Sequence, residues 1–176
     1  MKKFIFVDTQ VDFIDGALRN EEAIKAIPNL SKLLQYINEN NYWCVFTQDT
    51  HYDNYLDTLE GKKLPIPHCL EHSHGWEIYP DLKEDNYLTI QKNTFGYKSW
   101  KNYLSEDDEI YICGFCSDIC VISNALIIRA ILPNNKIFFI EDCSAGVTPQ
   151  KHKDAISIME SCQIDVIKLD ELTRKE

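Results

Sequence analysis

The sequence predicts an α/β fold, a Rossmann-like three-layer α/β/α sandwich with a mostly parallel sheet. Six short runs are strand candidates, and several of them are nearly continuous in apolar residues, as is typical of strands buried on both faces. Helical patterns separate these runs, and right-handed crossovers then place helices on both faces of the sheet. A chain of 176 residues, 44% of them hydrophobic, suits one such domain and is short for two, so we expect a single domain over residues 1–176.

The strand candidates are short, and most end at polar or turn-forming residues. They are 2–8 (KKFIFVD), 43–49 (WCVFTQD), 86–92 (NYLTIQK), 109–115 (EIYICGF), 136–142 (KIFFIED) and 163–169 (QIDVIKL). We therefore expect a six-stranded sheet.

Helices and one long loop are expected between the strands. Pro28 suits a first helical turn, and apolar residues then recur at helical spacing: Leu30, Leu33, Leu34 and Ile37. Residues 118–132 and 150–161 also look helical. Residues 50–80 contain glycine and proline but little periodicity. A loop of that length in a compact domain is usually functional, so we expect it to lie over the active end of the sheet.

Charge and cysteine content exclude several kinds of partner. The net charge of -10 and the pI near 4.9 would repel nucleic acid and anionic membranes. A run of only four apolar residues precedes Asp8, too few for a signal sequence, and no stretch approaches a membrane span. Seven cysteines, an odd number, indicate reduced thiols without a disulfide framework. We therefore expect a cytoplasmic protein.

Polar and reactive side chains follow most of the predicted strands. In open α/β sheets, ligands bind outside the carboxyl ends of the strands. Each of these residues alone has an ordinary structural explanation, such as capping a turn or filling the core. Together they indicate one functional edge: Asp8, Asp49, His51, Lys92, Cys116, Cys120 and Asp142.

The three cysteines near residue 116 have different expected roles. Cys113 lies inside a strand, where apolar surroundings make a thiol inert. Cys113 and Cys116 form C-x-x-C, but no second pair follows at zinc spacing, and a redox pair would open a helix. Ser117 is a good helix N-cap, which puts Cys120 in a first helical turn, where the helix dipole favours a thiolate. Cys120 is the candidate nucleophile, and the N–H groups of Cys116 and Cys120 are candidates for an oxyanion hole.

Five short motifs, in this order, resemble the signatures of the isochorismatase-like cysteine hydrolases, the superfamily that contains the nicotinamidases. They are DTQVDF (8–13), TQDTH (47–51), PHC with a following glycine-containing turn (67–75), QKNTFG (91–96) and GFCSDICV (114–121). The resemblance extends from Met1 to about residue 170 and implies a six-stranded parallel sheet.

The resemblance also implies a catalytic triad of Asp8, Lys92 and Cys120. It implies a cis peptide between Phe115 and Cys116 that turns the Cys116 N–H toward an oxyanion. Isochorismatase itself lacks the nucleophilic cysteine, so Cys120 indicates the amide-hydrolysing branch. In such an enzyme Asp8 would take the thiol proton and later give it to departing ammonia, while Lys92 would hold Asp8 and favour the thiolate.

A metal site is expected beside the triad. Asp49, His51 and His68 offer one oxygen and two imidazoles, a set suited to zinc, iron or manganese with open positions for water or substrate. The nicotinamidases bind a metal through matching residues. We expect zinc, with iron and manganese as alternatives, Glu60 as a candidate fourth ligand, and no organic cofactor. The remaining loop histidines, at 72 and 74, are expected to be solvated.

The substrate is expected to be a small, uncharged primary amide. Phe13 can stack on a planar ring, and Phe95 and Phe115 are further candidates for the substrate pocket. Nicotinamidases usually have a tryptophan shortly before the loop histidine, whereas this chain reads LPIPHC. The chain has three arginines, and only Arg19 is expected near Phe13.

We therefore predict a metal-assisted cysteine amidohydrolase of nicotinamidase type, which converts a small primary amide to an acid and ammonia through a thioester. An enzyme acting on another small amide or on a ureido or carbamoyl compound is the alternative. A non-catalytic binding or redox-responsive module is a third possibility. We expect a homo-oligomer, a dimer or tetramer, with no nucleic-acid or membrane partner.

Overall fold

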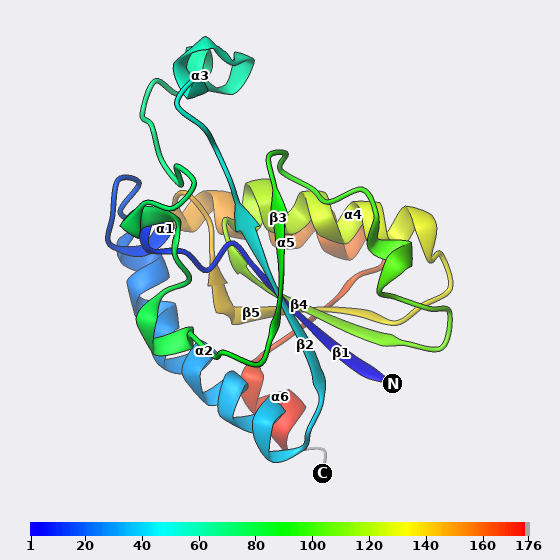
Figure 1. The fold of residues 1–176 in the computed structure, drawn as a ribbon. Coiled ribbons are helices and arrows are strands. Elements are labelled where there is room, and N and C mark those ends of the chain that lie inside the picture. The colour runs from blue at the N-terminus through cyan, green and yellow to red at the C-terminus, as the bar shows by residue number, and fades with distance from the viewer. Residues whose placement is uncertain (175–176) are drawn as a thin grey trace.

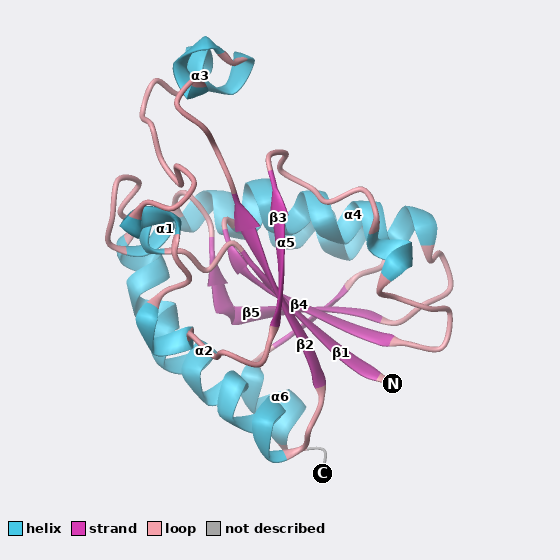
Figure 2. Ribbon diagram, in the orientation of Figure 1, coloured by secondary structure: helices cyan, strands magenta, loops and turns pink. Residues whose placement is uncertain are grey.

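The chain folds around one six-stranded sheet with the strand order β3-β2-β1-β4-β5-β6. In the computed structural model, which describes residues 1–174, every neighbouring pair of strands is parallel. The strands are β1 (Lys2–Val7), β2 (Trp43–Asp49), β3 (Leu88–Lys92), β4 (Glu109–Phe115), β5 (Ile137–Ala145) and β6 (Asp165–Ile167). The predicted six-stranded α/β fold is confirmed (Figures 1 and 2).

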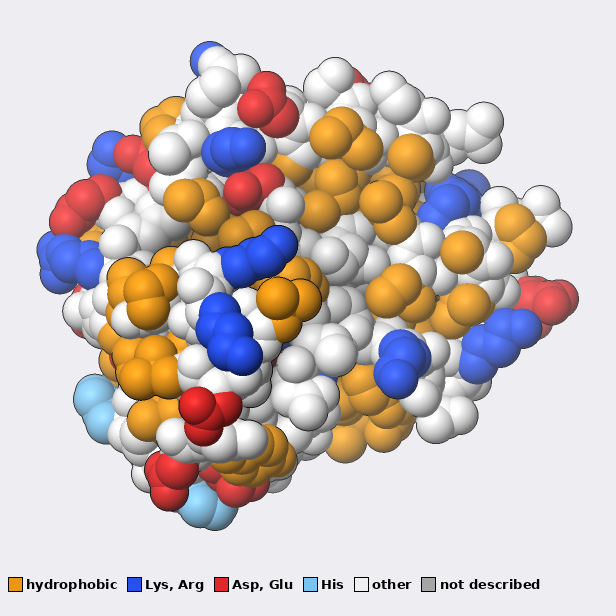
Figure 3. Space-filling view, turned by 90° about the horizontal axis from the view of Figure 1, so that it is seen from above, with side chains coloured by type: hydrophobic (Ala, Val, Ile, Leu, Met, Phe, Trp, Pro, Cys, Tyr) orange, Lys and Arg blue, Asp and Glu red, His pale blue; other side chains and the backbone are white. Residues whose placement is uncertain are grey.

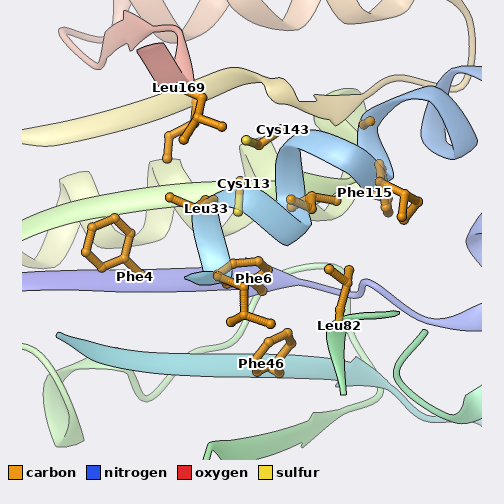
Figure 4. Close-up of a cluster of buried hydrophobic side chains, with 14 of the residues drawn as sticks. Phe4, Phe6, Leu33, Phe46, Leu82, Cys113, Phe115, Cys143 and Leu169 are labelled. Atoms are coloured by element: carbon orange, nitrogen blue, oxygen red, sulfur yellow. The ribbon is translucent and has the colours of Figure 1, made fainter. Parts of the chain in front are cut away.

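Helices cover both faces of the sheet, so the strands are buried from both sides. The helices are α1 (Val11–Ile14), α2 (Glu21–Glu39), α3 (Leu59–Lys63), α4 (Ile122–Ile131), α5 (Pro149–Ser161) and α6 (Leu169–Thr173). One core packs α2 and α6 against aromatic side chains of β1, β2 and β4 (Figure 4). The other packs α4 and α5 against aliphatic side chains of the same sheet. None of the helices within residues 1–174 is long and apolar enough to cross a membrane.

Two predicted element boundaries are wrong. Pro28 lies inside α2, because the apolar pattern starts earlier and the Asn20 side chain caps the helix by accepting from the N–H groups of residues 22 and 23. Asp142 does not end its strand, since β5 continues to Ala145. Its Oδ1 instead accepts a hydrogen bond of 2.8 Å from the Leu169 N–H at the start of α6. Asp142 therefore holds a helix and does not join the functional edge.

The segment between β2 and β3 contains only short helical turns. They are Tyr55–Asp57, α3, His74–Trp76 and Pro80–Leu82. Figure 1 shows α3 standing above the carboxyl ends of the strands, away from the two helical layers. The segment is tied back to the body where the His51 N–H donates to the Cys69 carbonyl and the Val11 N–H donates to the Glu77 carbonyl.

Candidate active site

Asp8 and Lys92 form a buried ion pair at the carboxyl edge of the sheet. The Lys92 Nζ lies 2.6 Å from Asp8 Oδ2, and both side chains are almost completely shielded from solvent. The Thr47 hydroxyl donates to Asp8 Oδ1 at 2.6 Å. Asp8 directly follows β1 and Lys92 ends β3, and β2 lies between these two strands. The pair therefore places a carboxylate and a fixed positive charge at the same point.

Burial and charge act in opposite directions on this pair. Burial raises the pKa of Asp8, Lys92 lowers it, and the net direction is upward, which suits a carboxylate that accepts and returns a proton. Burial lowers the pKa of Lys92, but the negative charges of Asp8 and Asp49 outweigh it, so the lysine stays protonated.

Cys120 lies in a π-helical turn, Ser117–Val121, that follows β4. The peptide bond between Phe115 and Cys116 is cis, as the resemblance implies. Burial raises the pKa of the Cys120 thiol, Lys92 lowers it, and Asp8 raises it again. The sequence predicted that a helix start would favour the thiolate, but burial is the larger effect, so the sulfur rests as a thiol. A base beside it is therefore needed, and Asp8 is that neighbour.

The predicted capping role of Ser117 is wrong. The residue before the turn is Cys116, and no side chain caps its N–H groups. The Ser117 hydroxyl instead lies 2.7 Å from Nδ1 of His152 in α5, and Ser117 is completely buried. The turn is thus tied to α5, which packs in the same core as α4. Cys113 is buried in the core beside β1, where burial raises its pKa strongly, in line with the predicted packing role.

Asn124, which the sequence did not single out, fixes the 117–121 turn against the segment after β3. Its amide donates to the Cys120 carbonyl at 2.8 Å, and its Oδ1 accepts from the Trp100 indole at 2.9 Å and from the Tyr97 N–H at 2.8 Å. Asn124 is fully buried in α4. An amide side chain among the many apolar residues of the predicted helix was the available signal, because buried polar groups are retained where their hydrogen bonds are satisfied.

Four further side chains converge on one point beside this triad. They are Asp49, His51, Glu60 and His68, whose candidate ligand atoms all lie within 4.8 Å of one another. His51 Nε2 is 2.8 Å from Asp49 Oδ2 and 3.7 Å from Glu60 Oε1, and His68 Nε2 is 3.6 Å and 3.7 Å from the same two oxygens. Glu60, the candidate fourth ligand, therefore lies with the other three.

The chemistry of this cluster suits a divalent metal. His68 Nδ1 must donate to the Ile66 carbonyl at 2.8 Å, since that oxygen can only accept, so Nε2 of the neutral ring presents a lone pair to the cluster. Burial raises the pKa of Asp49, but the neighbouring imidazoles of His51 and His68 and the charge of Lys92 lower it further, so it is ionised. Two imidazole nitrogens and two carboxylates are a donor set that zinc, iron and manganese accept.

Gln10 and Asp12 hold this cluster in place, and the sequence did not assign them a role. The Gln10 amide accepts from the Asp49 N–H at 2.8 Å and donates to the Asp49 carbonyl at 2.9 Å. Asp12 accepts from the Cys69 N–H at 2.8 Å, next to His68. Asp12 also fills the space beside Gly75, where an added Cβ would lie 2.1 Å from its Oδ2.

A cavity of about 1050 Å³ opens over Cys120 and the cluster. Phe13 and Phe95 line it, and the Phe13 ring lies 5.6 Å from the His68 ring. Phe115, expected in the pocket, does not line it. Phe115 shares a strand face with Cys113 and Tyr111 and packs in the core under α2. The exposed rings of His72 and His74 lie outside the cluster, as expected.

Comparison with known proteins places this arrangement in a family. The isochorismatase domain matches residues 3–171, which is nearly the whole chain. The chain belongs to the isochorismatase family. It is therefore an isochorismatase-family hydrolase, and the predicted resemblance is confirmed. No curated protein sequence matches the chain.

Solved structures of this family share its fold. The pyrazinamidase of Pyrococcus horikoshii in complex with zinc is 26% identical, with 95% of this chain and 98% of that chain covered and a TM-score of 0.79. The nicotinamidase of Bacillus subtilis is 24% identical, with coverage of 95% and 99% and a TM-score of 0.80. An isochorismatase-like hydrolase from Alkaliphilus metalliredigens is 20% identical, with coverage of 99% and 98% and a TM-score of 0.87.

Proposed function

We propose that this protein is a metal-assisted cysteine amidohydrolase of nicotinamidase type, which hydrolyses a primary amide to a carboxylic acid and ammonia. The observation that supports it most is the buried Asp8–Lys92 pair beside the Cys120 thiol, at the base of a cavity that also reaches the four-residue cluster. A buried thiol with a raised pKa is unreactive by itself. A base and a cation beside it allow the same thiol to act as a nucleophile.

The acylation half of the reaction uses residues of the triad. Asp8 accepts the thiol proton as the Cys120 sulfur attacks the amide carbonyl carbon, and Lys92 stabilises the negative charge that remains. The carbonyl oxygen, now negative, is proposed to accept hydrogen bonds from the N–H groups of Cys116 and Cys120. Asp8 then gives its proton to the nitrogen, the C–N bond breaks, and ammonia leaves a thioester on Cys120.

The deacylation half restores the enzyme. Asp8 takes a proton from water as the water oxygen attacks the thioester carbonyl, the C–S bond breaks, and the acid leaves while the sulfur regains its proton. The cluster of Asp49, His51, Glu60 and His68 would hold the metal, which we propose to be zinc. When bound, such a metal supplies a Lewis acid that orients a ring nitrogen or water of the substrate complex.

Ammonia release from an amide panel tests this function. Metal-loaded protein is expected to hydrolyse at least one of nicotinamide, pyrazinamide and a set of aliphatic and carbamoyl amides. Cys120→Ala should abolish that activity, whereas Cys113→Ala, the matched control in the core, should keep catalytic function in the fraction that folds. Hydroxylamine should trap the acyl group as a hydroxamate in the wild type only. Full turnover in Cys120→Ala would refute the assignment of the nucleophile.

The proposal also includes the expected location and oligomeric state of the protein. A cytoplasmic location is supported by the cysteines, all seven of which are free thiols. A dimer or tetramer is expected in solution and can be measured by light scattering.

A further inference from the structure

The cavity is large for the small amide that the sequence predicted. Its volume of about 1050 Å³ is at the upper limit of the range of roughly 300–1,000 Å³ that is usual for sites of drug-sized ligands. An amide with a single ring would contact the end near Cys120 and leave most of the remaining volume to water. The size therefore indicates a longer substrate.

The walls away from the catalytic end are mainly apolar. They come from the segment after α1, from α3 and the residue that follows it, from the segments after β3 and β5, and from the 117–121 turn. The apolar members are Ala17, Leu18, Leu59, Leu64, Phe95, Ile119 and Val147. Four of them remain between 37% and 72% exposed: Leu59, Leu64, Phe95 and Val147. Figure 3 shows hydrophobic side chains gathered on the upper face with basic side chains among them. An exposed apolar lining of this kind is typical of a ligand groove.

The charges along the cavity are divided. Its two carboxylates, Asp49 and Glu60, belong to the metal cluster, whereas its two cations, Arg19 and Lys63, do not. Lys63 makes no ion pair with the residues that the structure describes. Arg19 pairs with Glu21 through Nε at 2.8 Å, and its terminal nitrogens make no hydrogen bond within residues 1–174.

The chain has a net charge of -10, so most of its surface would repel an anion. The cavity differs, because Arg19 and Lys63 line it together with apolar side chains and a few uncharged polar ones. A guanidinium and an ammonium group are the side chains that best bind a carboxylate.

We propose that the substrate is an elongated primary amide with an apolar middle and a carboxylate at the end away from Cys120, which Lys63 and Arg19 bind. This inference rests on the proposed amidohydrolase function. It replaces the expectation of a small, uncharged amide, which depended on the scarcity of arginine in the recognised motifs and gave no weight to Lys63.

The decisive experiment compares two amides of equal chain length. Suberamic acid carries a terminal carboxylate, whereas octanamide does not, so the ratio of their kcat/KM values measures recognition of the anion. The wild type is expected to favour suberamic acid over octanamide and over nicotinamide. Lys63→Met should reduce the ratio about tenfold, as expected for loss of one charge-assisted hydrogen bond.

Lys62→Met is the matched control, because Lys62 is in the same helix but does not line the cavity. The ratio should stay unchanged in this variant. An equal loss in both variants would mean that general attraction of the anion, and not contact at Lys63, sets the preference. A wild-type ratio near one, or a preference for nicotinamide, would also overturn the inference while leaving the proposed amidohydrolase function intact.

Binding to Cys120→Ala separates the two proposals. Calorimetry should show tighter binding of suberamic acid than of octanamide, and Lys63→Met in the same background should reduce the ratio of the two affinities about tenfold. That result would support the inference even if no amide were hydrolysed by the wild type, an outcome that would refute the proposed function alone. Equal affinity for the two amides in Cys120→Ala would overturn the inference whatever the turnover.

Discussion

Replacing Lys92 by methionine should destabilise the protein by about 3–5 kcal/mol at neutral pH, the usual cost of breaking a buried ion pair. Methionine keeps much of the apolar stem but removes the charge 2.6 Å from Asp8. At an effective dielectric constant of about 20, the attraction at that distance is roughly 6 kcal/mol, and part of it is offset because a buried ammonium group no longer has to be desolvated. Asp8, which is fully buried, would be left without its counter-ion.

The loss should depend on pH in a defined direction. Burial already raises the pKa of Asp8 and Lys92 opposes this, so the variant's folded-state pKa rises further above the unfolded value of about 3.9. Protonation of Asp8 therefore stabilises the folded variant fully when the pH lies below the unfolded-state pKa. This stabilisation is lost as the pH rises through the folded-state pKa. Relative to the wild type, the variant should therefore be more stable at pH 5 than at pH 7.5.

Urea unfolding of metal-free protein, followed by tryptophan fluorescence at both pH values, measures these quantities. The double variant Lys92→Met with Asp8→Asn is the control, because a neutral amide at residue 8 removes the unpaired charge and tolerates the left-handed φ of 48°. It should recover most of the lost stability. The reasoning fails if Lys92→Met lies within about 0.5 kcal/mol of the wild type, or if the double variant is as unstable as the single one.

Three further predictions concern the metal cluster and the 117–121 turn. The double variant His51→Ala with His68→Ala should fall from about one metal ion per chain to nearly none by elemental analysis, and unchanged metal content would move the site elsewhere. Gly75→Ala should push aside the Asp12 carboxylate, which holds the loop next to His68. Metal affinity, measured by chelator competition, should fall about tenfold, as it does when an outer-shell contact is lost. Unchanged affinity would contradict that role of Asp12. Asn124→Asp replaces the donor to the Cys120 carbonyl with an acceptor and should cost about 1–3 kcal/mol of unfolding free energy, whereas a neutral effect would mean that the turn is held by other contacts.

The sequence could predict those site residues whose position follows from the end of a strand. Asp8, Asp49 and Lys92 come directly at strand ends, and parallel strands bring such residues to one edge. Glu60 was only a candidate, because its place in the cluster depends on how a loop without periodicity folds back. Phe115 was misplaced, since the alternation along β4 determines which face it occupies, and that face lies under α2.

The residues that hold the site in place were harder to predict. Gln10 bonds to the backbone of Asp49, which is 39 residues away, and Asp12 bonds to the backbone of Cys69, which is 57 residues away. Every residue type has the same backbone groups, so a hydrogen bond to the backbone cannot be predicted from the residue types of the two segments. Ser117 shows the same limit, because its hydroxyl bonds to His152, 35 residues away, while a local capping motif predicted a different partner.

The metal cluster and the triad come from different parts of the chain. All four cluster residues lie between Asp49 and His68, in one segment that leaves β2 and stands above the sheet, whereas Asp8, Lys92 and Cys120 follow three separate strands. Insertions or replacements in that one segment can thus change metal preference and cavity shape during evolution without moving the nucleophile or its base. Lys92 would limit such changes, because its Nζ lies 3.8 Å from the Asp49 carboxylate of the metal cluster.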